Sequence, residues 1–324
     1  MQARDVEIQE NHKNKVVNSP KSYERKKIWG DRKDGWILKD LSPFTKLVPH
    51  LMTSRNSSAV YFKEKLDVTN FVRYVEEKNK ELSITPVETS RGSIKKITYF
   101  NVFLTALVRL LALKPHLNRF IAGRNFYQRK KIEVAFVAKK EFSEEGEETI
   151  IKEAFQRDET LWSIASRLNR EIKTVKTEDT DDTTDLLNMF ARFPKPIVHL
   201  MVSFLDFLNY IGKYPEDIYK EDPMHASVVV TNLGSIGLRT VPYHHLYDRG
   251  TCSVFVCLGE IHKDKVKDDK TGELVSKDFV EISVTVDERI SDGFYYIGAM
   301  EKFNEILNNP KLLEEKLEHF PIDQ

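Results

Sequence analysis

The stretch that decides the fold is VDERISDG, at residues 286–293. Residues 279–286 alternate between apolar and polar side chains, which predicts a β-strand. Residues 292–307 predict a helix, with Asp292 as a candidate N-cap. Gly293 carries no Cβ and would allow another backbone to approach closely. The stretch therefore connects a strand to the last long helix of the chain.

The rest of the chain mixes predicted strands and helices. The C-terminal third is rich in strands, at 226–232 and 253–260, with a hairpin turn at 267–272. Residues 99–113 are apolar nearly all round, which predicts a helix in the core. Since no glycine-rich nucleotide loop is present, the pattern predicts a two-layer α/β sandwich with a mixed sheet. The other predicted elements are a helix capped by Ser42 that begins at Pro43, a strand at 60–68, a helix capped by Thr69 and a helix at 159–172.

Composition and charge describe a globular protein without a polyanionic partner. The 324 residues are 40% hydrophobic, enough for one substantial core. Lys and Arg number 50, as do Asp and Glu, so no net field attracts nucleic acid. Residues 1–30 are polar and no apolar run reaches about 18 residues, so we expect no membrane span. We predict a cytoplasmic protein with an N-terminal arm and a single domain over 31–324.

Two segments in the middle of the chain are harder to place. We predict that 128–131, QRKK, is a basic turn between two strands of an exposed hairpin. Residues 177–223 are predicted to be an insertion that opens with an acidic linker. Two apolar helical pieces follow within 186–214, and the second is too short to span a membrane. We expect this helix pair to cover a sheet or a subunit contact, with binding to a lipid surface as the alternative.

Two motifs resemble those of a known superfamily. Residues 228–237, VVVTNLGSIG, are similar to a strand and turn of the catalytic domain of 2-oxo acid dehydrogenase dihydrolipoamide acyltransferases and of chloramphenicol acetyltransferase. Residues 287–293 resemble the active-site motif His-x-x-x-Asp-Gly of these enzymes, with Glu288 in place of the histidine. Weaker likeness extends over about 42–300, whereas 177–223 resembles no part of them that we can place.

The resemblance implies a chloramphenicol acetyltransferase-like fold and a homotrimer, or a multiple of trimers, with active sites between subunits. Coenzyme A or an acyl-CoA is the implied donor, and the acceptor is a small molecule or a lipoyl-type group. Thr231 matches the hydroxyl that donates to the oxyanion, although it can equally satisfy backbone groups at a strand end. Asp292 matches an aspartate that pairs with an arginine, either Arg55 or Arg289. The candidate cofactor-binding residues lie in the turn, where the glycine can instead simply set the backbone: Asn232, Gly234 and Ser235.

Glu288 decides whether the implied chemistry survives. A glutamate has a pKa of about 4.3 and a thiol one of about 8.5, so proton abstraction starts about 5–6 kcal/mol uphill. Burial away from cations would raise the carboxyl pKa and make Glu288 a usable base. The alternative is an ion pair between Glu288 and a lysine or arginine of a neighbouring subunit.

The sequence contains other residues that could take the role of the histidine that the motif lacks. Ser291 is a possible nucleophile, but its surroundings are not Gly-x-Ser-x-Gly and the sequence places no base beside it. No grouping has the spacing of metal ligands, so we expect no metal. The cysteines Cys252 and Cys257 should point to opposite faces of one strand, which argues against a disulfide. The histidines near the Thr231 strand are candidate replacements: His225, His244 and His245.

Two functions are consistent with the sequence. In the first, the chain is a coenzyme-A-dependent acyltransferase that works by direct transfer, with Glu288 or a relocated histidine as the base. In the second, it is a non-catalytic trimer that keeps the fold as a binding or scaffold module. Glu288 and the unplaced helix pair motivate the second hypothesis, whereas Thr231, Asn232 and Asp292 motivate the first.

Overall fold

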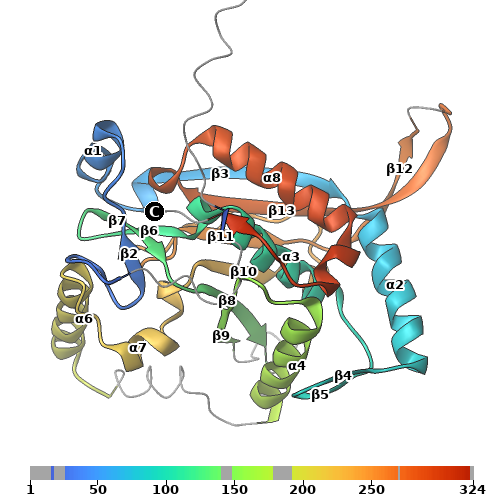
Figure 1. Ribbon diagram of the computed structural model, residues 1–324, viewed down its shortest axis with the longest axis horizontal. Coiled ribbons are helices and arrows are strands. Elements are labelled where there is room, and N and C mark those ends of the chain that lie inside the picture. Colours follow the sequence, from blue (N-terminus) through green and yellow to red (C-terminus); the bar gives the residue numbers. More distant parts are fainter. Residues whose placement is uncertain (1–15, 18–25, 140–147, 178–191, 269–270, 322–324) are drawn as a thin grey trace, which may run out of the picture.

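The computed structural model describes residues 16–17, 26–139, 148–177, 192–268 and 271–321. Its centre is a seven-stranded sheet in the order β12-β13-β11-β10-β8-β9, with β3 also paired to β13 (Figure 1). Strand β10 runs parallel to β8 and β11, and the other pairs are antiparallel, so the sheet is mixed. The strands are β3 (Ala59–Asp67), β8 (Ile132–Lys139), β9 (Glu148–Phe155), β10 (Val228–Asn232), β11 (Val254–Leu258), β12 (His262–Lys267) and β13 (Leu274–Asp287).

One face of this sheet is covered by helices. Alternate side chains of β10 and β11, such as Val228, Val230 and Val256, point into a large apolar core that the helices complete. Helix α3 crosses this core and is buried from Asn101 to Ala112, which its all-round apolar sequence requires. The helices of this layer are α2 (Thr69–Ile84), α3 (Tyr99–Leu113), α4 (Leu161–Thr177) and α8 (Gly293–Asn308).

The opposite face of the sheet is covered by a loop instead of helices. Val229, Phe255 and Cys257, the alternate residues of β10 and β11, form a second, smaller core with Val241 and Leu246 of the loop after β10. Both cysteines are buried and free. Cys252 precedes β11, and both side chains lie in this second core, so the prediction that they point to opposite faces of one strand is wrong. The division of the side chains of β10 and β11 between two cores therefore follows from the period of two along each strand.

Smaller elements flank the main sheet. A three-stranded sheet has the order β2-β7-β6, and short pairs are formed by β4 with β5 and by β1 with β14. Their bounds are β1 (Val16–Val17), β2 (Gly35–Ile37), β4 (Val87–Thr89), β5 (Gly92–Ile94), β6 (Arg119–Ala122), β7 (Asn125–Arg129) and β14 (Phe320–Pro321). The remaining helices are α1 (Pro43–Leu51), α6 (Lys195–Tyr210) and α7 (Glu216–Glu221), which lie beside the helical layer in Figure 1.

Several predictions from the sequence are confirmed. The fold is the predicted α/β sandwich with a mixed sheet. Helix α3 has the predicted bounds, and Ser42 caps α1 by accepting a hydrogen bond from the N–H of Thr45 at 3.1 Å. The hairpin turn before β13 joins β12 to β13, where Lys267 pairs with Leu274. Thr69 is not a cap: it is the first residue of α2, and Val68 stands at the N-cap.

The predicted basic turn at 128–131 is wrong. Gln128 and Arg129 belong to β7 and are both only 1% exposed. The segment before the predicted turn, 119–127, forms not one strand but parts of two, β6 and β7. Strands β7 and β8 lie in different sheets, so they form no hairpin. The charge of Arg129 suggested a surface turn, but Arg129 has partners inside the protein, namely the backbone carbonyl and hydroxyl of Thr251 at 2.7 and 2.8 Å.

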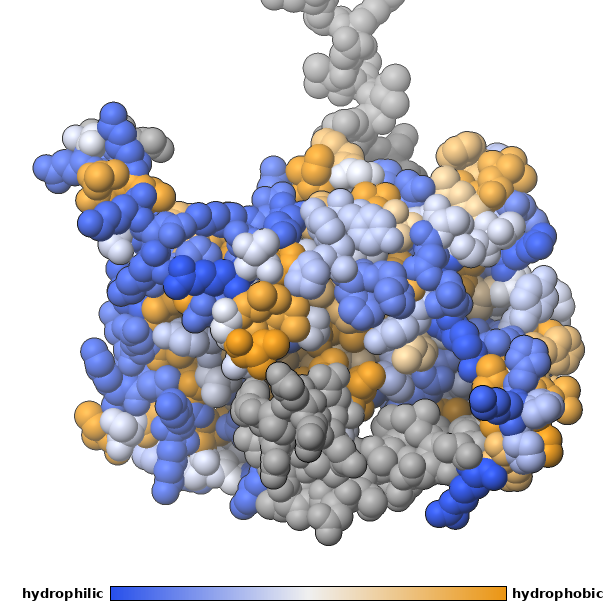
Figure 2. Space-filling view, turned by 180° about the vertical axis from the view of Figure 1, so that it is seen from behind, coloured by the Kyte–Doolittle hydropathy of each residue, from blue (hydrophilic) through white to orange (hydrophobic). Residues whose placement is uncertain are grey.

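Helix α6 corresponds to the second predicted helical piece of the insertion. It keeps most of its apolar side chains at the surface, with Leu200 69% and Phe204 57% exposed, so these side chains do not cover the main sheet. Figure 2 shows the molecule from behind, and hydrophobic residues are visible at its right edge, the side on which α6 lies. The acidic linker and the first helical piece fall almost entirely outside the described residues. No described helix has both the length and the hydropathy needed to cross a membrane.

Candidate functional site

The stretch 286–293 connects β13 to α8 through one short turn of 3-10 helix, Glu288–Ile290. Asp292 caps α8, because its carboxylate accepts a hydrogen bond from the N–H of Tyr295 at 2.8 Å. It does not pair with either predicted arginine. Arg55 instead donates to the carbonyls of Tyr247 and Gly250, at 2.8 and 2.7 Å. The N-cap alternative for Asp292 is thus the one the structure shows, and the helix starts where the sequence predicts.

A buried ion pair holds the stretch in place. Arg289 folds back onto Asp287, with its Nε and Nη2 atoms each 2.7 Å from one carboxylate oxygen. Both side chains are almost completely buried. Arg289 also donates to the carbonyl of Met52 at 3.0 Å, and the hydroxyl of Tyr296 donates to the carbonyl of Asp287 at 2.9 Å. These bonds fix the direction in which the backbone leaves the sheet.

Glu288 points away from this buried pair. Its side chain is exposed, and among the described residues it forms no hydrogen bond or ion pair. Within one copy of the chain, therefore, neither alternative for Glu288 is present. It is not buried in an apolar pocket, and it has no cation beside it.

A histidine stands beside the motif in a place that the sequence did not suggest. The Nδ1 atom of His116 is 3.2 Å from the hydroxyl of Ser291, within hydrogen-bond distance. The ring of His116 stacks on Tyr295, with centroids 4.3 Å apart, and its backbone N–H donates to the Tyr295 hydroxyl at 3.1 Å. The expectation that Ser291 has no base beside it is wrong. His116 follows α3, and only the fold brings it to a residue 175 positions away.

Thr231 lies at the other end of the sheet from Glu288. Thr231 on β10 is level with Cys257 on β11, which is level with Ser283 on β13. Glu288 follows Ser283 by five residues, which corresponds to about 17 Å along an extended strand. Within one copy, the predicted oxyanion donor and the motif are therefore too far apart to contact one reacting group.

The three residues predicted to bind the cofactor have structural contacts in the turn after β10. The hydroxyl of Ser235 donates to the carbonyl of Asn232 at 2.7 Å. A Cβ on Gly234 would lie 2.3 Å from the carbonyl oxygen of Gly259, so only glycine allows the two backbones to approach this closely. In contrast, a Cβ on Gly293 would have no atom of this chain within 4 Å, so Gly293 is not needed for close approach within one copy.

We expect Gly234→Ala to lower the free energy of unfolding by about 1–3 kcal/mol, because the new methyl group must displace the backbone at Gly259. Gly293→Ala is the matched control, since the same methyl group meets nothing there. We expect this control to change stability by less than about 0.5 kcal/mol. Urea unfolding measures both variants, and equal stabilities would contradict the prediction.

The other candidate histidines do not reach the motif. The ring of His244 stacks on Phe255 with centroids 3.8 Å apart, on the loop-covered face of the sheet. His245 stacks on His244 in the same loop. His225 is buried against Thr251, and burial holds the pKa of its imidazole well below the usual value. Within the described part of the chain, no three His, Cys, Asp or Glu side chains are grouped so that they could hold a metal ion.

Comparisons with known proteins define the class of fold. No family model matches the sequence, and no curated protein matches it. Solved structures match at low identity. A probable dihydrolipoamide acetyltransferase from Listeria monocytogenes is 14% identical, covers 84% of this chain and 94% of its own, and has a TM-score of 0.54. The cubic core of a pyruvate dehydrogenase multienzyme complex is also 14% identical, covers 85% and 94%, and has a TM-score of 0.54.

A chloramphenicol acetyltransferase is 10% identical, covers 84% of this chain and 99% of its own, and has a TM-score of 0.52. The chain therefore has the fold shared by chloramphenicol acetyltransferase and the dihydrolipoamide acetyltransferase cores. This confirms the fold that the resemblance implied. At these identities the likeness concerns the fold, and the chemistry has to be argued from the residues of this chain.

Proposed function

We propose that this protein transfers an acyl group directly from a coenzyme A thioester to a small thiol, hydroxyl or amine acceptor. The observation that carries the proposal is the contact between His116 and Ser291 inside the motif at 287–293. A histidine has a pKa of about 6.5, so it is a better base for a thiol or hydroxyl than an exposed glutamate of pKa about 4.3. His116 thus supplies the relocated base that Glu288 cannot provide.

The proposed reaction has two steps, attack of the acceptor on the thioester and collapse of the oxyanion, and the proton taken up in the first step is returned in the second. The acceptor passes its proton to the Ser291 oxygen while the Ser291 proton moves to Nδ1 of His116, and the acceptor atom forms a bond to the thioester carbonyl carbon. The oxyanion then collapses and the carbon–sulfur bond breaks. The coenzyme A thiolate leaves with the proton returned from His116 through Ser291. Stacking on Tyr295 holds the imidazole at its place for both transfers.

The oxyanion donor in this proposal is Thr231 of a second copy of the chain. Thr231 and the motif lie at opposite ends of the sheet, so one copy alone does not combine them. Symmetric assembly can bring opposite ends of two copies together. Support for assembly comes from the fold neighbour that forms the cubic core of a multienzyme complex. We therefore propose a homotrimer, or a multiple of trimers, with the acyl-transfer site between subunits.

Chromatographic measurement of the free coenzyme A formed from acetyl-CoA, in the presence of a panel of thiols, alcohols and amines, tests the function. We expect turnover with at least one acceptor and a loss of about 10²–10⁴-fold in kcat/KM for Ser291→Ala and His116→Gln, the usual contribution of general-base catalysis. Glu288→Gln is the matched control in the same stretch and should stay within about threefold of the wild type, since an exposed carboxylate contributes little here.

Three outcomes would contradict the proposal. A loss of activity in Glu288→Gln alone would make Glu288 the base. A stable acyl ester on Ser291, found by mass spectrometry, would show a covalent route in place of direct transfer. No turnover with any acceptor would favour the scaffold hypothesis, which is motivated by Glu288 standing in place of the motif histidine.

A further inference from the structure

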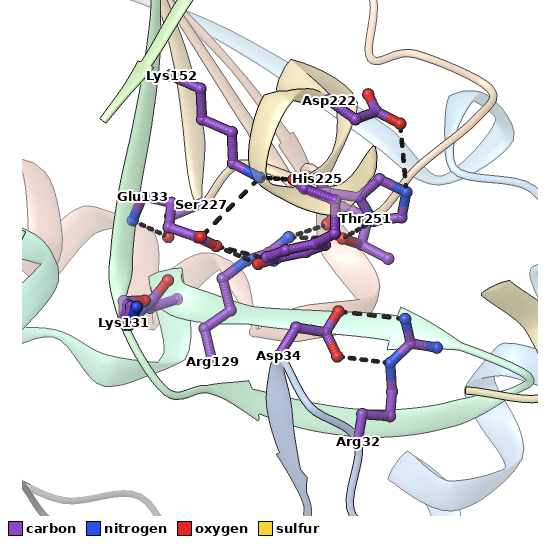
Figure 3. Close-up of polar contacts among 12 residues, drawn as sticks. Arg32, Asp34, Arg129, Lys131, Glu133, Lys152, Asp222, His225, Ser227 and Thr251 are labelled. Atoms are coloured by element: carbon purple, nitrogen blue, oxygen red, sulfur yellow. Dashed lines mark hydrogen bonds and ion pairs between the residues drawn. The ribbon is translucent and has the colours of Figure 1, made fainter. Parts of the chain in front are cut away.

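A second polar site lies outside the motif, where α7 approaches the ends of β7 and β8. Three segments that are distant in the sequence, around 32–34, 130–133 and 212–220, enclose a cavity of about 140 Å³. Figure 3 shows the side chains of this region converging from different elements. The segment at 212–220 lies in the part of the sequence for which we can place no likeness to the dihydrolipoamide acyltransferases. None of the residues that line the cavity belongs to the motif at 287–293.

Every carboxylate that lines the cavity already has a donor. Asp34 accepts two hydrogen bonds from Arg32, at 2.8 and 3.1 Å. Glu216 is paired with Lys33 at 3.2 Å. Each of these acids is thus neutralised by a neighbour at the cavity wall.

Glu133 is the third lining carboxylate and the most buried. It accepts a short hydrogen bond from the hydroxyl of Tyr219 and faces two buried cations, Arg129 and Lys152, each 3.9 Å away. Lys152 donates to the carbonyl of Tyr219 at 2.6 Å, and burial lowers its pKa to about 8. One carboxylate therefore faces two cations, which lie behind the cavity wall and do not line the cavity themselves.

The cations retain hydrogen-bond donors that no described residue uses. Arg129 is 1% exposed, yet its Nε and Nη1 atoms have no hydrogen-bond partner among the described residues. Among the described residues, the ammonium group of Lys131 forms no hydrogen bond, although it lies near enough to Glu216 to help lower the pKa of that carboxyl. Lys33 and Lys220 share Glu216, and an ammonium group has three N–H donors, so both have donors to spare. The wall offers donors and positive charge, while its acceptors are occupied.

We infer that this cavity binds a small anion that carries a carboxylate or phosphate group. Such groups supply the acceptors and the negative charge that the wall lacks, and charge-assisted hydrogen bonds to them are strong. A volume of about 140 Å³ limits the ligand to a small molecule. A bound anion would bridge α7 to the ends of β7 and β8 and would stabilise their contact. The inference does not depend on acyl transfer.

Titration calorimetry of the full chain with sodium phosphate and, separately, with sodium succinate tests the inference. We expect at least one anion to bind with a dissociation constant below about 1 mM and to raise Tm by about 2 °C or more at saturation. A response to phosphate alone indicates a phosphorylated ligand, and a response to succinate alone indicates a carboxylate. Neither anion binding at about 10 mM would overturn the inference.

Variants at the rim localise the binding without disturbing the core. Lys131→Met and Lys220→Met each remove one exposed cation, and we expect each to weaken binding by about tenfold. Lys96→Met is the matched control, because Lys96 is an exposed lysine outside the cavity. It should bind as the wild type does. If all three variants bind alike, the anion is not held in this cavity.

Discussion

Asp287→Ala is expected to lower the free energy of unfolding by about 3–5 kcal/mol, the usual effect of removing one partner of a buried ion pair. Asp287 is fully buried and receives both hydrogen bonds from Arg289 at 2.7 Å. Without the carboxylate, the guanidinium stays buried with one remaining bond, to the carbonyl of Met52. Urea unfolding followed by circular dichroism gives the difference in free energy.

An exposed ion pair of the same chemistry is the control for this experiment. Lys302 and Glu305 lie 2.6 Å apart on the surface of α8, with side chains 35% and 62% exposed. Water screens this pair, so Glu305→Ala should change stability by less than about 0.5 kcal/mol. If Asp287→Ala costs no more than Glu305→Ala, the buried pair does not hold the stretch between β13 and α8.

The sequence predicts this fold well where short-range patterns decide the structure. The alternation along β13, the cap at Asp292 and the all-apolar run of α3 each depend on residues within a few positions of one another. Their periods of two and 3.6 determine strand and helix directly. The sequence predicts that Gly234 sets a turn, but glycine is required at 234 for close approach to the backbone of Gly259, which appears only in three dimensions.

Two of the errors share one physical cause, which is that distant segments supply the partners of polar side chains. Arg129 is charged and was placed in an exposed turn, yet Thr251, 122 positions away, supplies its hydrogen bonds inside the protein. The sequence does not indicate His116 as a base, because its contact with Ser291 spans 175 positions. A hydrogen bond between distant segments leaves no periodic pattern in a single sequence. The proposed catalytic base and the anion cavity both depend on such contacts.

Mixing two inactive variants is expected to restore activity, because Thr231 and Ser291 lie at opposite ends of one copy. Thr231→Val removes the proposed oxyanion donor without changing the side-chain shape, and we expect it to cost about 10²–10³-fold in kcat. When Thr231→Val and Ser291→Ala chains are unfolded, mixed in equal amounts and refolded together, about a quarter of the sites between copies should be intact. The mixture should then recover about a quarter of wild-type activity.

The control for this experiment carries both substitutions in one chain and is mixed with the wild type in equal amounts. If each site is shared by two copies, activity should fall to about a quarter of the wild-type value, since both contributing copies must be intact. If each site lies within one copy, activity should fall only to about half, and the two single variants should not restore each other. A site shared between copies therefore raises the activity of the mixture of single variants and lowers the activity of the mixture of double variant and wild type, each relative to a site within one copy. Agreement between them would locate the oxyanion donor on a neighbouring copy even if the acyl acceptor used in the assay is not the natural one.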